Sequence, residues 1–184
     1  MAETPSHMLP LGTLAPQFKL LDSRTGKLVS LEDAKSSIAT VIMFICNHCP
    51  YVKHIQERLV EVAKTYQAKG VSFIAISSND IKSYPEDSPD NMRKEALKYG
   101  YNFPYLYDET QQVAKACHAA CTPDIFVYDS NLGCVYRGRF DDATPGNPNP
   151  VTGKDLCNAL DNILSGKPIN PHQKPSLGCS IKWK

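Results

Sequence analysis

The sequence has no apolar run that approaches the roughly 20 residues needed to cross a membrane. Its first residues, MAETPSHMLPLGTLAPQF, lack the basic start and apolar stretch of a signal peptide. It also lacks an excess of either charge, with 20 Lys and Arg against 19 Asp and Glu, and it shows no basic stripe. We therefore expect a cytoplasmic protein with no membrane partner and no nucleic-acid partner.

The number of cysteines is odd, whereas a small secreted domain held by disulfides typically has an even number. There are seven, scattered over a chain of 184 residues, which is long enough for one domain with a substantial core. In a reducing compartment most would be free thiols, and a close pair is more often catalytic or metal-binding than structural. The one C-x-x-C pair is Cys46 and Cys49, in FICNHCPYVKH.

Local patterns predict alternating strands and helices around this pair. Residues 40–46, TVIMFIC, form a continuous apolar run typical of a buried central strand. In residues 50–68 the apolar positions recur in steps of three and four, which indicates a helix. Residues 71–77, VSFIAIS, predict a second buried strand. Such a unit implies a right-handed parallel crossover.

The remaining patterns complete an α/β fold with a mixed central sheet flanked by helices. We expect an N-terminal hairpin in residues 14–31, a second hairpin formed by residues 124–129 and 133–140, and a closing helix near residue 160. The domain would span residues 10–165. Residues 1–9 would form an N-terminal tail, and the Pro-rich residues 166–184 an extended C-terminal tail.

The position of the cysteine pair, after a buried strand and at the start of a helix, suits thiol chemistry. Backbone N–H groups and the helix dipole would favour a thiolate on Cys46, so we expect it to be the more exposed thiol with the lower pKa. The thiolate is the nucleophile in disulfide exchange. Cys49, on the same helical face, could then resolve a mixed disulfide. Pro50 suits the first helical turn, where its missing N–H is tolerated.

A metal site is the alternative for the same segment. Cys46, His48, Cys49 and His54 all carry atoms that bind metals. A structural zinc site usually has a second ligand pair at a characteristic spacing, and the sequence has no second C-x-x-C. We therefore favour a redox pair, which needs no metal or other cofactor.

Four segments, taken in order, resemble the thioredoxin superfamily: VIMFICNHC, GVSFIAIS, CTPDIFVYD and LGCVYRG. The opening LGTLAPQFKLLDSRTGKLVSLED is similar to the N-terminal hairpin of its TlpA-type and AhpC/TSA branches. The resemblance implies a thioredoxin fold in which Cys46 attacks and Cys49 resolves. It also implies a cis peptide bond between Thr122 and Pro123, beside an exposed backbone edge on which an extended substrate can pair.

Some positions depart from the thioredoxin pattern or leave two interpretations open. Ile45 stands where thioredoxins usually carry Trp. His48 precedes the second cysteine, as in oxidising members, and would favour a Cys46 thiolate unless it is simply solvated. Asp80 is either an auxiliary acid or a turn residue. Cys121, two residues before Pro123, should face the pair, as a third redox thiol or passively. Cys179 has no evident partner.

Three functions follow from these observations. The first is a thiol–disulfide oxidoreductase that acts on protein disulfides and dithiols and needs a separate redox donor. The second is an antioxidant peroxidase of the AhpC/TSA type, although Met43 stands where peroxiredoxins need Thr or Ser. The third is a non-catalytic metal-binding or redox-sensing module.

Overall fold

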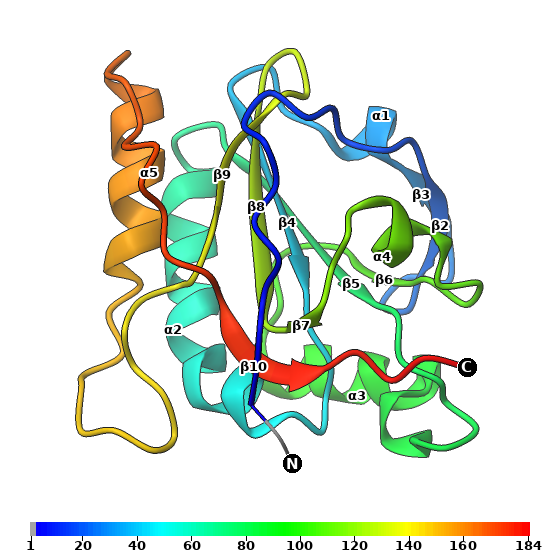
Figure 1. The fold of residues 1–184 in the computed structure, drawn as a ribbon. Coiled ribbons are helices and arrows are strands. Elements are labelled where there is room, and N and C mark those ends of the chain that lie inside the picture. The colour runs from blue at the N-terminus through cyan, green and yellow to red at the C-terminus, as the bar shows by residue number, and fades with distance from the viewer. Residues whose placement is uncertain (1–2) are drawn as a thin grey trace.

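The computed structural model describes residues 3–184, so residues 1 and 2 of the predicted N-terminal tail lie outside it (Figure 1). The elements in chain order are β1 (Glu3–Pro5), β2 (Lys19–Asp22), β3 (Leu28–Ser30), α1 (Leu31–Ala34), β4 (Ala39–Phe44), α2 (Pro50–Gln67), β5 (Ser72–Ser77), the 3-10 turn η1 (Pro85–Asp87), α3 (Pro89–Tyr99), β6 (Tyr105–Tyr107), α4 (Gln112–Ala116), β7 (Cys121–Thr122), β8 (Asp124–Asp129), β9 (Cys134–Gly138), α5 (Lys154–Leu164) and β10 (Leu177–Ser180). The predicted strand–helix–strand unit is present within two residues of its expected bounds.

The large sheet has seven strands in the order β3-β2-β6-β5-β4-β8-β9. Strands β4, β5 and β6 run parallel, while β8, β9 and the β2–β3 hairpin pair antiparallel. All six residues of β4 are buried, because helices cover both faces of the sheet around it. The mixed sheet flanked by helices confirms the predicted α/β fold.

Two apolar cores lie on the two faces of this sheet. One contains the buried faces of α2, α3 and α5, packed against inward residues of β4 and β5. The other contains residues of α1 and α4 and the alternate residues of the same strands. Figure 1 shows α2 and α5 together on one side of β8 and β4, with α1 and α4 on the other. The loop between β4 and α2 therefore begins at the centre of the sheet.

Helix α2 begins and ends as its sequence predicts. Pro50 occupies the first turn, where its missing N–H would have no intrahelical partner. After the helix, Gly70 adopts a left-handed conformation with φ 89° and donates its N–H to the Gln67 carbonyl. The helix is thus fixed at both ends, and its N-terminus points at the cysteine loop.

The two ends of the chain form a second, three-stranded sheet in the order β1-β10-β7. Strand β10 lies in the middle and pairs antiparallel with β1 on one side and with β7 on the other. In Figure 1 the red β10 crosses the molecule beside the blue N-terminal segment and next to β7. The C-terminal tail is therefore extended, as predicted, but it is also paired with the rest of the chain.

None of the helices within residues 3–184 has both the length and the apolar character needed to span a bilayer.

Candidate active site

Cys46 and Cys49 lie in the loop that joins the end of β4 to the start of α2. Cys49 is the N-cap residue of α2, and Cys46 lies three positions before it. The expectation that Cys46 occupies the helix N-terminus is therefore wrong, because the helix begins only at Pro50. Both thiols are buried: Cys46 is 2% exposed and Cys49 is not exposed, so Cys46 is the more exposed thiol, as expected, by a small margin.

Thr122 contacts both thiols. Its side-chain oxygen lies 3.4 Å from Cys46 Sγ, and its carbonyl oxygen accepts a 3.0 Å hydrogen bond from the Cys49 thiol. The peptide bond from Thr122 to Pro123 is cis, as the resemblance implies. The structure thus brings Cys46, Cys49, Thr122 and Pro123 together from segments more than 70 residues apart.

The backbone edge at Thr122 is covered by the chain itself. Cys179 of β10 pairs with Thr122, and Ser180 pairs with Cys121. The expectation of an exposed edge for a substrate strand is therefore wrong, because the C-terminal tail already occupies that edge.

His48 faces a carboxylate that the sequence analysis did not identify. Its Nδ1 donates to Asp87 Oδ2 over 2.6 Å, whereas Cys46 Sγ lies 3.9 Å from the same nitrogen. The imidazole also stacks on Tyr84, with ring centroids 5.0 Å apart. The hydrogen bond to Asp87 raises the pKa of His48. The ring N–H of His48 is thus directed at Asp87. From the sequence, we had expected it to act on Cys46.

Asp87 also fixes the backbone of the cysteine loop. Its Oδ1 accepts the N–H of Asn47 at 2.8 Å and that of His48 at 3.3 Å, and its Oδ2 accepts from the Asn79 amide at 2.8 Å. Burial opposes ionisation of Asp87, but the hydrogen bonds from His48 and Asn79 outweigh it and lower its pKa. The carboxylate therefore takes up loop N–H groups that would otherwise be free to stabilise a thiolate.

The two thiols share one proton when the pair is reduced and singly ionised. A hydrogen bond to Cys49, burial and the negative charge of Asp87 raise the pKa of Cys46. The hydrogen bond from Cys46 lowers the pKa of Cys49 to about 5, although burial opposes the shift. The contact with the Thr122 carbonyl belongs to the protonated form of Cys49, since a carbonyl only accepts. The expected order of the two pKa values is thus reversed.

The two auxiliary candidates do not join the thiols. Asp80 accepts hydrogen bonds from Ser83 Oγ and from the Lys82 N–H, and these lower its pKa. It is a turn residue, the second of the two interpretations. Cys121 precedes Thr122 in β7, so its side chain points to the opposite face, and its thiol lies 3.5 Å from the Pro123 carbonyl. The expectation that Cys121 faces the pair is wrong.

A third thiol reaches the pair from the C-terminal tail. Cys179 is only 3% exposed and belongs to the same apolar core as Cys46 and Cys49. Each of the two thiols, Cys49 and Cys179, shifts the pKa of the other. No local pattern indicates this contact, because it depends on where the tail returns.

One group of possible metal ligands occurs among the described residues. It consists of Cys46, His48 and Asp87, whose ligand atoms all lie within 4.8 Å of one another. The set differs from the one considered from sequence, since Asp87 takes the place of Cys49 and His54. The Asp87 oxygens already accept hydrogen bonds from His48, Asn47 and Asn79, which accounts for the cluster without an ion.

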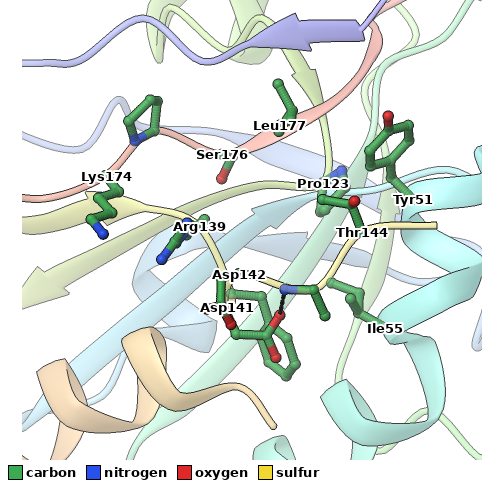
Figure 2. Close-up of a pocket in the computed structure, with 13 residues that line it drawn as sticks. Tyr51, Ile55, Pro123, Arg139, Asp141, Asp142, Thr144, Lys174, Ser176 and Leu177 are labelled. Carbon is green, nitrogen blue, oxygen red and sulfur yellow. Dashed lines mark hydrogen bonds between the residues drawn. The ribbon is translucent and has the colours of Figure 1, made fainter. Parts of the chain in front are cut away.

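A groove runs along the tail beside Pro123. It has a volume of about 290 Å³ and is lined by residues of α2, of the segment after β9 and of the tail. Figure 2 shows Pro123 between Tyr51 of α2 and Ser176 of the tail, with Ile55 below.

A buried ion pair supports the segment that carries Thr122. Arg137 contacts Asp124 at 3.0 Å, and neither side chain is exposed. The guanidinium also donates to the carbonyl oxygens of Cys117 and His118, in the loop before β7. This pair fixes both ends of the Thr122–Pro123 segment.

The sheet order, the dithiol at the start of α2 and the adjacent cis-proline define a thioredoxin-like protein of the oxidoreductase class. More narrowly, the chain belongs to the AhpC/TSA family, whose model matches residues 11–136. Comparison with curated proteins found no significant match.

Two solved structures are similar over nearly the whole chain. An uncharacterized conserved protein from Geobacillus kaustophilus is 60% identical, with a TM-score of 0.98 over 100% of this chain and 97% of that one. A hypothetical protein from Sinorhizobium meliloti 1021 is 47% identical, with a TM-score of 0.95 over 98% of each chain. A thiol:disulfide interchange protein of the thioredoxin family from Chlorobium tepidum is 19% identical, with a TM-score of 0.64 over 85% of this chain and 99% of that one, and shares the fold.

Proposed function

We propose that this chain is a thiol–disulfide oxidoreductase that uses Cys46 and Cys49 to exchange disulfides with other proteins. The observation that carries the proposal is the position of Thr122, which lies 3.4 Å from one thiol and 3.0 Å from the other. Two thiols held together and coupled through one proton can be oxidised to a disulfide and reduced again without a cofactor.

In the reductive direction, Cys46 attacks the substrate disulfide and forms a mixed disulfide with one of its sulfurs. The Cys49 thiolate takes the proton of Cys46 as the attack begins, and the other substrate sulfur leaves as a thiolate. After Cys49 is deprotonated again, it attacks Cys46. The mixed disulfide breaks, the Cys46–Cys49 disulfide forms, and the second substrate thiolate is released. A separate dithiol partner then reduces the pair by the same steps in reverse.

His48 and Asp87 set the balance between the reduced and oxidised pair. Asp87 opposes a negative charge on Cys46, and its hydrogen bond to His48 favours the protonated imidazole, whose Nδ1 lies 3.9 Å from Cys46 Sγ. The two residues thus act on the stability of the reduced form, and through it on the reduction potential.

A peroxidase is the second candidate, since the matched family is AhpC/TSA. In that reaction Cys46 would attack a peroxide oxygen with help from a hydroxyl three residues earlier. Position 43 carries Met, which is wholly buried in the core and has no hydroxyl to offer. Disulfide exchange is therefore the function that the geometry supports best.

Trapping tests the proposal most specifically. In Cys49→Ser, the mixed disulfide on Cys46 cannot be resolved, so substrate proteins should stay attached and be released by reductant. The double variant Cys46→Ser/Cys49→Ser should hold none, and Cys157→Ser, which alters a half-buried cysteine of α5, should behave like the parent protein. Purified wild-type protein should also reduce insulin with a dithiol donor. Equal insulin reduction by Cys46→Ser would contradict the proposal.

A further inference from the structure

The tail strand β10 is fitted closely over the active site. Strand β10 pairs with the backbone edge of β7. Strand β1 pairs with the other edge of β10, where Glu3 lies opposite Cys179. Beyond the strand, the N–H of Lys182 donates to Asn79 over 2.8 Å, and before it Ser176 Oγ donates to the Gly138 carbonyl over 2.8 Å. The tail is thus held by hydrogen bonds on both sides of the site.

Gly178 is required where the tail passes the Thr122–Pro123 segment. A Cβ atom at this position would lie 2.0 Å from the Thr122 carbonyl oxygen and 3.2 Å from Pro123 Cδ. The first distance is far inside van der Waals contact, and the atom that it meets is backbone, which cannot swing aside. The close approach of the tail therefore depends on the absence of a side chain here.

The register of β10 against β7 places Cys179 on the side of the sheet where the thiols of Cys46 and Cys49 lie. In an antiparallel pair, opposite residues point to the same face of the sheet, so Cys179 projects to the side on which Thr122 meets Cys46. Cys49 reaches the same place from α2, because its sulfur lies 3.0 Å from the Thr122 carbonyl. Three thiols from the cysteine loop and the tail are therefore gathered in one water-poor space.

In the reduced protein the third thiol stays protonated. Burial, followed by the hydrogen bond to Cys49, raises the pKa of Cys179 to about 12, so it keeps its proton while Cys49 carries the charge. Once Cys49 is oxidised, that charge is gone, and Cys179 is the one of these three thiols that is still free.

We propose that Cys179 is a third redox thiol, which takes over the disulfide from the Cys46–Cys49 pair. The inference rests on the proposed function, since the pair must first be oxidised. Cys179 loses its proton and attacks Cys49 Sγ, the Cys46–Cys49 bond breaks, and a Cys49–Cys179 bond forms. Cys46 leaves as a thiolate and takes up a proton. One disulfide is exchanged for another, so no further oxidant or reductant is needed.

The exchange links the redox state of the site to how firmly the tail covers the Thr122 edge. A Cys49–Cys179 disulfide would tie the tail over the Thr122 edge and leave Cys46 as a thiol, ready to attack a substrate placed in the groove beside Pro123. Reduction of that bond would leave the tail held by strand pairing and hydrogen bonds alone.

Disulfide mapping in Cys46→Ser tests the inference. The variant is equilibrated in a glutathione buffer, free thiols are alkylated, and its disulfides are mapped by peptide mass spectrometry. We expect a Cys49–Cys179 disulfide in most molecules and none in Cys46→Ser/Cys179→Ser, whereas Cys46→Ser/Cys157→Ser should match the single variant. Cys179 left as a thiol, with Cys49 free or bound to glutathione, would overturn the inference. The separate variant Cys179→Ser shows whether Cys46 and Cys49 pair, so failure of the proposed function is seen independently.

A glycine pair tests the role of the tail. Gly178→Ala, made in the Cys46→Ser background, should displace β10, abolish the Cys49–Cys179 disulfide and speed alkylation of Cys49. Gly146→Ala is the matched control, because its new Cβ would meet only Thr144 Oγ1, at 4.0 Å. A Cys49–Cys179 disulfide that forms equally well in Gly178→Ala would show that the close passage of the tail does not position Cys179.

Discussion

His48 donates its Nδ1–H to Asp87 over 2.6 Å, and the other oxygen of the same carboxylate accepts the N–H of Asn47. One buried acid from η1 therefore fixes both the ring and the backbone of the cysteine loop. Its charge acts on Cys46 at the same time. The loop geometry and the thiol chemistry thus depend on the same side chain.

Asp87→Asn should make Cys46 easier to ionise. Asn keeps an oxygen that can accept the loop N–H groups, but it removes the negative charge that raises the pKa of Cys46. The pH profile of Cys46 alkylation in the reduced protein should shift to lower pH, and Asp80→Asn should leave it in place. An unchanged profile in Asp87→Asn would remove Asp87 from the electrostatics of the site.

His48→Gln should lower stability more at pH 6 than at pH 9. The pKa of His48 is raised in the folded protein, so its protonated form stabilises the fold below the unfolded value of about 6.5. That contribution disappears as the pH rises through the higher folded value. Urea unfolding of the reduced protein at both pH values measures the effect, with the exposed His172→Gln as control. A loss that is equal at both pH values would contradict the assignment.

Arg137→Met should destabilise the fold by about 3–5 kcal/mol, because it leaves the buried Asp124 carboxylate without its partner. The exposed pair of Arg58 and Glu61 provides the comparison, and Arg58→Met should cost only about 0–1 kcal/mol. Urea unfolding reports both values. Equal costs for the two variants would show that burial of the Arg137–Asp124 pair has no energetic consequence.

Peroxide turnover should remain close to the rate of an ordinary thiol. Met43 offers no hydroxyl to polarise a peroxide, and both Cys46 and Cys49 are buried. Stopped-flow measurement of peroxide consumption with a reductant present, with Cys46→Ser as the background, gives the rate. Turnover orders of magnitude faster that depends on Cys46 would favour the peroxidase.

Much of the fold could be predicted from local patterns. The apolar run of β4, the three- and four-residue spacing in α2 and the hairpin of β8 and β9 are short-range features, and all three are present. The resemblance added Thr122 and Pro123, which no spacing relates to the cysteine loop.

Asp87 and Cys179 could not be predicted, for a physical reason. Asp87 lies in a polar, turn-rich segment typical of a solvated loop, yet it is wholly buried because His48, Asn47 and Asn79 all donate to it. Cys179 lies in a Pro-rich tail whose pairing with β7 is set by long-range contacts. The low pKa of Cys49 depends on Cys46, on Cys179 and on the backbone N–H of Val52 in the first turn of α2.

The most direct test of the central claim is a redox titration of Cys179→Ser, in which only the Cys46–Cys49 pair remains at the site. The protein is equilibrated in a series of glutathione buffers, alkylated, and analysed by intact mass and peptide mapping. We expect two thiols to be lost together in a single two-electron transition, with one disulfide joining Cys46 to Cys49. Thiols at 46 and 49 that persist in the most oxidising buffers, or that form only separate glutathione adducts, would contradict the claim.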